Sequence, residues 1–305
     1  MTLPSDAVPA TFLAFADRDG QWAEWVASVP GRLASALEDW EVEVDGPSTH
    51  GYTALVVPVR TADGTPAVLK VGWPFEEPRQ EWLALRRWGG RGAVRLLRAD
   101  PARNVLLLER LHARDLRAVD DLTACEVVAS LYADLHVPAP PRLDRLSETI
   151  ASRTDELAAL PRTAPLPRRL VEQAVHLGRA LATDPATDGT VVHTDLHDEN
   201  VLAADREPWL AIDPQPLSGD PHYEPAPMLW NRWHEVVASH DVRGTVRRRF
   251  HTLVDVAGLD EDRAREWVVV RELHNALWAV QDVAAGHGDP DDVTIAITVA
   301  KAVQD

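Results

Sequence analysis

The sequence predicts an α+β protein made of two lobes with a cleft between them. Between residues 41 and 109, short β-rich runs alternate with turns around one helical stretch, a pattern typical of an antiparallel sheet. After residue 111 the pattern is mainly helical, except that residues 191–213 read as short strands and a polar loop. We therefore expect a strand-rich lobe at residues 1–110 and a helical lobe at residues 111–305.

The elements of the first lobe can be assigned in chain order. The first forty residues are expected to be helical, because Trp22, Trp25 and Val26 form an apolar stripe at helical spacing. Strands are predicted at residues 52–60, 67–71, 93–98 and 104–109, with turns at 61–66 and 100–103. Helical periodicity at residues 77–88 adds one helix to the sheet.

The second lobe is expected to be built from amphipathic helices. They are predicted at residues 122–135, 167–181, 228–239, 242–256 and 262–285. The proline-rich stretches 138–141 and 161–167 read as connectors within the lobe. Cys125 is expected to be a buried small hydrophobe, and the helical Trp residues are expected to pack in the core: Trp230, Trp233, Trp267 and Trp278.

The composition is typical of a soluble enzyme, and its net charge disfavours binding to anionic partners. The chain has 305 residues, 45% hydrophobic and 26% charged, with a formal net charge of −17. Such a charge disfavours binding to nucleic acid or to an anionic membrane and favours cationic partners. No signal peptide or apolar span is recognisable, so we expect a cytoplasmic protein. The one basic run, Arg247–Arg249, reads as a solvated helix face.

The strongest functional signal is the polar segment His193–Asn200. It is followed by a predicted strand, a turn at 205–208 and a second strand that ends at Asp213. A hairpin of this kind would fold Asp213 back beside Asn200, with Asp195 on the same loop. Three oxygen-bearing side chains would then converge on one small volume.

This convergence is what phosphoryl transfer requires. Metal ions neutralise the phosphate oxygens while a carboxylate positions the attacking hydroxyl, and kinases place a metal-binding Asn five residues after the catalytic Asp. Asp195, Asn200 and Asp213 match this order. The alternatives are an ordinary capped turn, or a zinc site at His193 and His197, which lacks a third soft ligand nearby. We expect His193 to hold the loop backbone.

A kinase also needs a lysine on a strand and a glutamate on the next helix. Lys70 lies in an apolar strand, and Lys301 is the other lysine of the chain. Glu81 is the preferred partner on the following helix, with Glu76 and Glu77 as competitors. The alternative is that Lys70 extends to solvent from its strand.

Two further segments are candidates for nucleotide contacts. The turn 45–51, with Ser48 and Gly51, could bring backbone N–H groups to phosphate oxygens, although it is not a Gly-x-Gly-x-x-Gly loop. The backbone at Glu109 and Leu111 could bond the edge of the adenine base. For the apolar strand 105–109, a plain buried strand is the alternative.

The stretch 207–221, with 229–232 after it, resembles the aminoglycoside/hydroxyurea phosphotransferase family, which includes streptomycin 6-phosphotransferases and has the protein-kinase-like fold. The order of elements is similar from about residue 40 to the C-terminus. The resemblance implies an ATP cleft between the lobes, ATP and Mg²⁺ as cofactors, and a role in antibiotic resistance. Gln215 departs from the family, because a basic or small residue is expected after the Asp-Pro pair.

The resemblance also implies individual roles. Asp195 would be the base, Asn200 and Asp213 the magnesium ligands, and Lys70 with Glu81 the pair that positions the phosphates.

The resemblance and the net charge together suggest the acceptor. It would be a cationic aminoglycoside, aminocyclitol or amino sugar, with a streptomycin-like molecule favoured. The polar residues that could line its pocket are Asp220, Glu224, Asn231, Glu272, Asn275 and Asp282.

Other readings remain open from the sequence. The chain could be a kinase of an unrelated small metabolite, or a silent nucleotide-binding relative. A protein kinase is disfavoured, since Thr194 and Pro214 replace the Arg and Phe of the protein-kinase motifs. The sequence does not distinguish ATP from GTP, resistance from biosynthesis, or a monomer from a homodimer.

Overall fold

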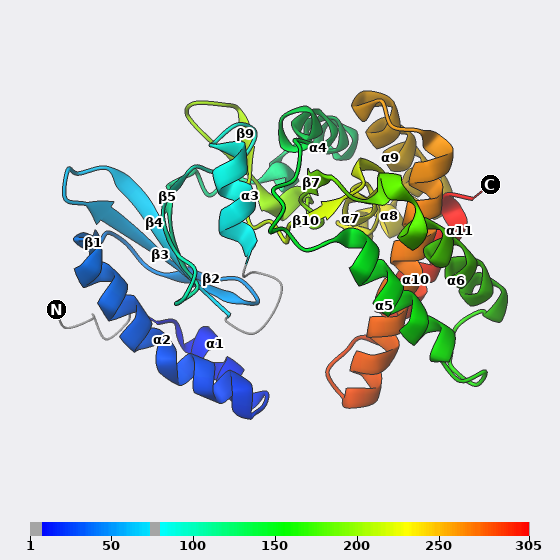
Figure 1. The fold of residues 1–305 in the computed structure, drawn as a ribbon, viewed down its shortest axis with the longest axis horizontal. Helices are drawn as coiled ribbons and strands as arrows, with labels where there is room; N and C mark the ends of the chain where they lie inside the picture. Colours follow the sequence, from blue (N-terminus) through cyan, green and yellow to red (C-terminus); the bar gives the residue numbers. More distant parts are fainter. Residues whose placement is uncertain (1–7, 74–79, 305) are drawn as a thin grey trace. The chain divides into compact units, whose positions relative to one another are not determined.

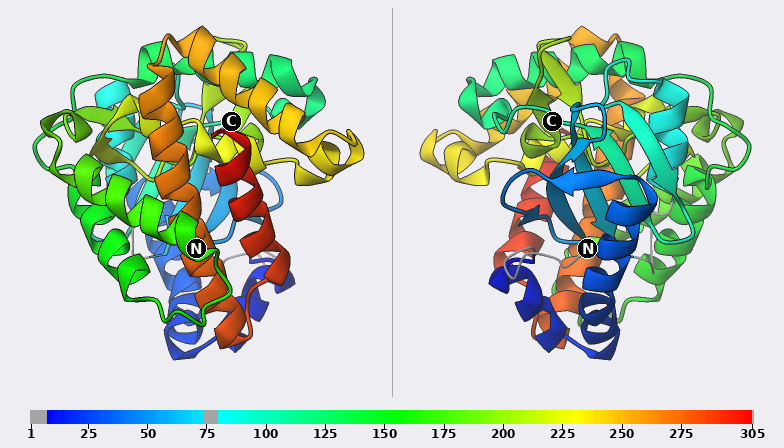
Figure 2. Two further views of the ribbon diagram at one scale, coloured as in Figure 1. Left: turned by 90° about the vertical axis from the view of Figure 1, so that its right-hand side faces the viewer. Right: turned by 90° about the vertical axis from the view of Figure 1, so that its left-hand side faces the viewer.

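The computed structural model describes residues 8–73 and 80–304 (Figures 1 and 2). It contains two compact units, one of residues up to His112 with Ala204–Arg206, the other of Ala113–Ala203 with Glu207 onward. The predicted division at residue 110 had not assigned residues 204–206 to the first unit. The predicted helix start at residue 77, and the competing partners Glu76 and Glu77, lie outside the described residues.

The first unit is built on one antiparallel sheet, as predicted. Its strands are β1 (Val42–Val44), β2 (Thr49–His50), β3 (Ala54–Thr61), β4 (Pro66–Gly72), β5 (Leu96–Asp100) and β6 (Val105–Glu109). Their order is β1-β3-β4-β6-β5, and β2 also pairs with β3. The edge strand is interrupted between β1 and β2, opposite Pro58 of β3, which has no N–H to donate there.

The two faces of this sheet carry different chemistry. Side chains alternate along a strand, so Leu69 and its neighbours in register point to one face and Lys70 points to the other. Helix α2 (Gly20–Asp39) covers the apolar face, and its Trp25, Val29 and Leu33 are buried there (Figure 1). Lys70 is thereby kept on the face that also receives α3 (Glu81–Trp88).

The second unit is mainly helical. Its helices are α4 (Asp121–Leu135), α5 (Leu146–Ala159), α6 (Arg168–Thr183), α7 (Ala226–Trp230), α8 (Trp233–Ala238), α9 (Val242–Ala257), α10 (Glu261–Ala285) and α11 (Pro290–Ala302). The strands β7 (Thr190–Val192) and β10 (Leu217–Gly219) pair, as do β8 (Val201–Ala203) and β9 (Trp209–Ala211). No described helix combines the length and apolarity needed to cross a membrane.

Three helical predictions and one strand prediction in this unit needed correction. The single helix predicted at 228–239 is two helices, because the chain turns at Arg232, whose φ is +50°. Helices α5 and α11 and strand β10 had not been predicted. Helix α5 lies between the two proline-rich stretches and buries Leu146, Ile150 and Leu157 at helical spacing.

The basic run is not uniformly solvated. Arg249 is 1% exposed, and its guanidinium donates to the carbonyls of Met228 and Asn231 at the end of α7 and pairs with Asp121. A cation at the C-terminal end of a helix is favourable, because the last carbonyls there lack intrahelical partners. Arg249 is therefore a structural residue that ties α9 to α7.

The tryptophans also differ from one another. Trp267 is fully buried in α10, as predicted, whereas 41% of Trp278 is exposed. Cys125 is fully buried, which agrees with its assignment as a small hydrophobe.

Candidate active site

The polar loop His193–Asn200 follows β7 directly, and the β8–β9 hairpin returns the chain to it. In the hairpin Val201 pairs with Ala211, and the Ile212 N–H donates to the Asn200 carbonyl at 2.9 Å. This register places Asp213 beside Asn200, the juxtaposition that the sequence had suggested.

His193 anchors the loop from inside. It is fully buried, its Nε2 lies 2.9 Å from the Ile212 carbonyl, and the Asp195 N–H donates to its Nδ1 at 3.2 Å. Burial lowers its pKa, so the ring is neutral, with Nε2 as the donor. Both ring nitrogens are occupied by the backbone, which rules His193 out as a zinc ligand.

Thr194 has a left-handed conformation that a β-branched residue adopts only under constraint, with φ at +63°. Its N–H donates to Glu224 Oε2 at 3.0 Å, its hydroxyl donates to the Gln215 carbonyl at 2.6 Å, and its carbonyl accepts from the Arg271 guanidinium. Three groups distant in sequence thus fix the residue that precedes Asp195.

Asp195 is presented on this fixed backbone. Its carboxylate, about a quarter exposed, receives the side-chain amides of Gln215 at 3.3 Å and Asn200 at 3.4 Å. These donors orient the carboxylate while leaving it accessible. Gln215 was known from the sequence only as a departure from the family pattern, and the structure gives it a contact with the candidate base.

Asn200 and Asp213 have the donor set that a magnesium–nucleotide complex requires. The Asn200 amide nitrogen donates to the Asp195 carbonyl at 2.8 Å, so the amide oxygen points the other way. Asp213 is held in a left-handed conformation, with φ at +55°. One amide oxygen and one carboxylate fit Mg²⁺, whose remaining ligands are phosphate oxygens and water. The described residues contain no cluster of three His, Cys, Asp or Glu ligands.

The first unit contains the predicted lysine–glutamate pair. Lys70 Nζ lies 2.7 Å from Glu81 Oε2, and the two side chains are 8% and 3% exposed. An ion pair so shielded from water keeps the ammonium on one side of the sheet rather than in solvent. The solvent-directed alternative for Lys70 is therefore wrong.

The predicted nucleotide turn lies slightly further along the chain than expected. The hairpin between β2 and β3 turns at residues 51–53: the Gly51 N–H donates to the Ala54 carbonyl at 3.0 Å, Tyr52 and Thr53 form the tip, and Ser48 precedes β2. The turn is braced by the N-terminal helices: His50 Nε2 lies 2.8 Å from Thr11 Oγ1, and the Arg18 guanidinium stacks on Tyr52 at 4.3 Å.

At the predicted adenine edge, part of the backbone is already engaged. The Glu109 N–H donates to the Arg95 carbonyl at 3.0 Å, and the Glu109 side chain binds the Arg206 guanidinium. Only the Glu109 carbonyl and the Leu111 backbone are left as predicted contacts to the base.

Three of the six predicted acceptor residues have other roles. Asp220 is 2% exposed and accepts hydrogen bonds from Arg263 Nε and Trp267 Nε1, at 2.6 and 2.7 Å. Glu224 is fully buried beneath the polar loop His193–Asn200, where it accepts hydrogen bonds from the N–H groups of His193 and Thr194. Both carboxylates are hydrogen-bonded to other groups of the protein. The sequence could not show this, because their partners are distant in the chain.

Asn231 is the third of these residues. Its Nδ2 lies 3.1 Å from Nδ1 of His197, while Nε2 of that ring faces the Asn200 amide at 3.2 Å. Asn231 therefore orients a histidine that contacts the candidate metal ligand.

The other three predicted residues line one pocket of about 360 Å³ in the second unit. Glu272, Asn275 and Asp282 come from α10. The remaining lining residues are Trp230, Trp278, Ala279, Asp292, Ile295 and Ala296. One lining residue lies near the polar loop His193–Asn200: the Trp230 ring centroid is 5.9 Å from that of His197.

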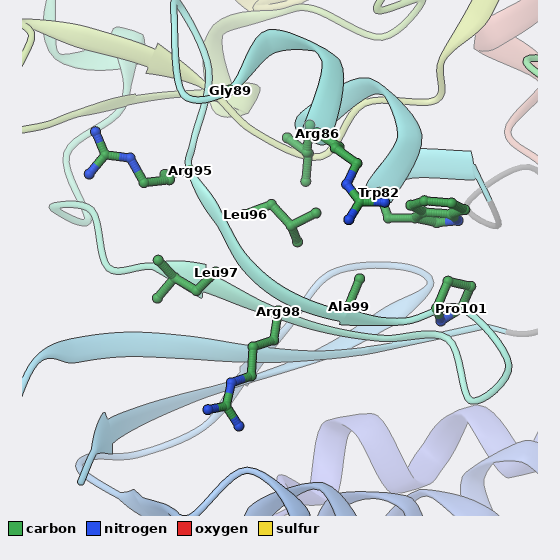
Figure 3. Close-up of a pocket in the computed structure, with 10 residues that line it drawn as sticks. Trp82, Arg86, Gly89, Arg95, Leu96, Leu97, Arg98, Ala99 and Pro101 are labelled. Atoms are coloured by element: carbon green, nitrogen blue, oxygen red, sulfur yellow. The ribbon is translucent and has the colours of Figure 1, made fainter. Parts of the chain in front are cut away.

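A larger pocket, about 600 Å³, lies in the first unit between α3 and β5 (Figure 3). Arg86, Arg95 and Arg98 line it, but Figure 3 shows their side chains pointing in different directions. They do not form a convergent binding site, and the pocket contains none of the catalytic-loop residues.

Comparisons with known proteins identify the family of this chain. Residues 39–283 match the aminoglycoside/hydroxyurea antibiotic resistance kinase family. This chain belongs to that family of kinases. A streptomycin 6-kinase of Streptomyces glaucescens is 44% identical over 277 residues, which are 89% of each chain. A hydroxyurea phosphotransferase of Kitasatospora aureofaciens is 45% identical over 269 residues, 85% of this kinase and 75% of the relative.

Solved structures show the same fold at low identity. A choline kinase from Streptococcus pneumoniae aligns with a TM-score of 0.60 and 15% identity, over 90% of this kinase and 98% of that chain. A thermostable mutant of an aminoglycoside phosphotransferase, solved with ADP and hygromycin B, aligns with a TM-score of 0.57 and 17% identity, over 89% and 97%. The predicted bilobal, kinase-like α+β fold is therefore confirmed.

Proposed function

We propose that this kinase transfers the γ-phosphate of ATP to a hydroxyl group of a streptomycin-like aminoglycoside. The observation that carries the proposal is the catalytic loop, in which Asp195 is oriented by Gln215 and Asn200 on a backbone fixed by Glu224 and Arg271. A carboxylate so placed can position an acceptor hydroxyl and accept its proton as the new P–O bond forms.

The chain's other residues hold the nucleotide. Asn200 and Asp213 would hold Mg²⁺, which when bound neutralises charge on the phosphate oxygens. Lys70, kept in place by Glu81 at 2.7 Å, supplies a fixed positive charge for the phosphates. Gly51, at the start of the β2–β3 turn, has open space where a side chain would be, which lets a phosphate come close to the turn.

The pocket lined by α10 favours a cationic acceptor. It combines the carboxyl groups of Glu272, Asp282 and Asp292 with two indole rings, a combination that binds ammonium or guanidinium groups. Streptomycin carries guanidinium groups, and a relative that covers most of this chain is a streptomycin 6-kinase. Hydroxyurea is the second candidate, supported by the relative at 45% identity, but it is small and uncharged.

The direct test is to incubate the purified chain with radiolabelled ATP and Mg²⁺, with streptomycin or hydroxyurea as acceptor. We expect streptomycin to be phosphorylated, and mass spectrometry and NMR should locate the phosphate group. The Asp195→Asn variant should form this product far more slowly than wild type. Phosphorylation of hydroxyurea alone would favour the second candidate. If neither acceptor is labelled although ATP binds, the proposal is wrong.

We also infer that the enzyme acts in the cytoplasm, where ATP is available, and that it protects the cell from its acceptor. Expression in a sensitive host should raise the tolerated streptomycin concentration, and the Asp195→Asn variant should not. Size-exclusion chromatography with light scattering would distinguish a monomer from a homodimer.

A further inference from the structure

We propose that Glu272 is protonated in the free enzyme and releases its proton when a cationic acceptor enters the pocket, so that acceptor binding and proton release are coupled. The proposal rests on the proposed function, because it concerns the acceptor pocket. It assigns to one residue the selection of positively charged acceptors over neutral ones of similar shape.

The position of Glu272 is unusual for an acidic side chain. It lies in the middle of α10 and is only 1% exposed, yet it lines the pocket with Asn275 and Asp282. In the part of the chain that the structure describes, the Glu272 carboxyl group has one hydrogen bond, which Asn275 Nδ2 donates to Oε1 at 3.4 Å. A buried carboxylate normally has a cation or several donors as partners, since loss of hydration costs several kcal/mol.

The neighbouring cation on α10 does not serve this purpose. Arg271 directs its guanidinium to the carbonyls of Thr194 and Tyr223 and over the Tyr223 ring, at 4.5 Å from the ring centroid. It is committed to the catalytic loop, one residue away from Glu272 in sequence.

The other charged groups around the pocket do not compensate Glu272 either. Asp282 of α10 and Asp292 of α11 are acidic, and α7 contributes the uncharged Trp230. From α5, Arg153 stacks its guanidinium on the Trp278 ring at 4.0 Å. His274 of α10 faces Thr154 of α5. Burial lowers the pKa of His274 to about 3, so its ring is neutral.

These surroundings determine the charge state of Glu272. Burial raises its pKa to about 8, against the weaker opposing effects of the Arg271 charge and the Asn275 hydrogen bond. The free enzyme at neutral pH therefore holds a carboxylic acid at this position. A guanidinium or ammonium group in the pocket would supply the missing partner and favour the carboxylate. The O–H bond of the acid then breaks, and the proton passes to solvent.

The contact between Arg153 and Trp278 indicates which kind of ligand group can bind beside Trp278 in this pocket. A guanidinium already lies over the Trp278 indole, with its central carbon 4.0 Å from the ring centroid. Planar cations stack on indole faces and bind carboxylates in a bidentate manner. The geometry therefore favours a guanidinium-bearing acceptor for the position facing Glu272.

Isothermal titration calorimetry of the full chain tests the coupling. Streptomycin is titrated at pH 7 in phosphate and in Tris, whose ionisation enthalpies differ. Streptidine, its guanidinium-bearing cyclitol, is used in parallel, because guanidinium groups do not titrate near neutral pH. We expect close to one proton released per acceptor bound. The affinity should increase about tenfold between pH 6 and pH 7, as linkage to a single group requires.

Two variants assign the proton. Glu272→Gln mimics the protonated acid, so proton release and the pH dependence of the affinity should both disappear. Asp282→Asn removes an exposed carboxylate from the same pocket and is the matched control: binding should weaken but proton release should remain.

The outcomes are distinct. Streptomycin that binds and is phosphorylated without proton release, or with release that persists in Glu272→Gln, overturns the coupling and leaves the proposed function intact. If streptomycin neither binds nor is phosphorylated, the proposed function fails and the coupling fails with it.

Discussion

Glu224 and Glu272 lie in the same unit and are equally buried, at 0% and 1% exposure, but their pKa values are shifted in opposite directions. Burial opposes ionisation of Glu224, yet the His136 ring at 3.6 Å and the N–H groups of His193 and Thr194 outweigh it and lower its pKa. Glu272 has one long hydrogen bond, and burial raises its pKa to about 8. Partners, rather than depth, decide the charge of a buried carboxyl group.

The comparison separates two regions of the helical unit. Around Glu224, backbone and side chains are fixed to one another, which suits a loop that must present Asp195 in one position. Around Glu272, polar groups are left with few protein partners beside an open pocket, which suits a place where a ligand completes the contacts. The predictions below test this division, beginning with the largest effect.

Replacing Asp195, the candidate base, tests the function of the region around Glu224. Asp195→Asn keeps the shape of the side chain but removes its capacity to accept a proton. We expect turnover to fall by at least about 10²-fold, the usual scale for a positioned base. Nucleotide affinity, measured by titration calorimetry, should be nearly unchanged. Turnover close to wild type in the purified variant would remove Asp195 from the mechanism.

Replacing Asp220 tests whether a buried carboxylate that is fully hydrogen-bonded within the protein has a structural role. Asp220→Ala leaves the Trp267 N–H without its acceptor and removes one ion pair of Arg263. We expect the free energy of unfolding in urea to fall by about 3 kcal/mol. KM for streptomycin should stay within about twofold of wild type. A rise in KM without loss of stability would restore Asp220 to the acceptor site.

The matched pair Glu224→Gln and Glu272→Gln tests the comparison itself. The Glu224 amide would place an NH₂ group against a backbone N–H, so we expect a loss of about 2 kcal/mol in stability and a lower kcat. The Glu272 amide resembles the acid already present, so stability at pH 6 should not fall. Equal destabilisation of both variants would show that the two carboxyl groups have the same charge.

The pH dependence of stability gives the same contrast with a defined sign. The folded-state pKa of Glu272, about 8, lies above the ordinary value of 4.5 for a glutamate carboxyl group, so its stabilising contribution is complete in acid and is lost as the pH rises to about 8. Relative to Glu272→Gln, wild type should lose on the order of a few kcal/mol between pH 5 and 8. The contribution of Glu224, whose pKa is lowered, is lost instead in acid. Urea titrations at several pH values measure both.

Gln215 should show the smallest effect. Gln215→Leu removes the amide that donates to Asp195 at 3.3 Å, while Gln215 is exposed and its backbone bonds remain. We expect kcat to fall about fivefold, equivalent to one hydrogen bond of roughly 1 kcal/mol, with stability unchanged. Steady-state kinetics beside a urea titration checks both. An unchanged kcat would mean that Asn200 alone orients the base.

The candidate site was predictable where its chemistry is local in sequence. Asp195, Asn200 and Asp213 lie on one loop and one hairpin, and a strand register fixed by short-range pairing brings them together. Lys70 and Glu81 are separated by eleven residues and were likewise predicted as a pair. Helical spacing places Asn275 and Asp282 on one face of α10, and the structure has both lining one pocket; their contact with an acceptor stays a prediction.

The remaining roles depend on partners far away in the chain. Glu224 contacts His193 from 31 residues away, and Arg271 reaches Thr194 from 77 residues away. Asp220 and Glu224 were assigned to the acceptor because exposed and buried carboxyl groups look alike in a sequence. Strand β10 was missed because it is only three residues long. Helix α11 was missed although Asp289 and Pro290 are typical of a helix start; its many β-branched residues favour strands.

The sequence by itself predicted most of the strands and helices and the kinase-like loop, because these follow from periodicity, turn residues and short spacings. The family was indicated by the resemblance of residues 207–221 and 229–232. Only the tertiary structure decided which acidic side chains are hydrogen-bonded within the protein and which line the pocket. The physical reason is that the charge and availability of a carboxyl group depend on donors and burial supplied by other elements. For Glu224 and Glu272, these come mostly from residues far away in the chain.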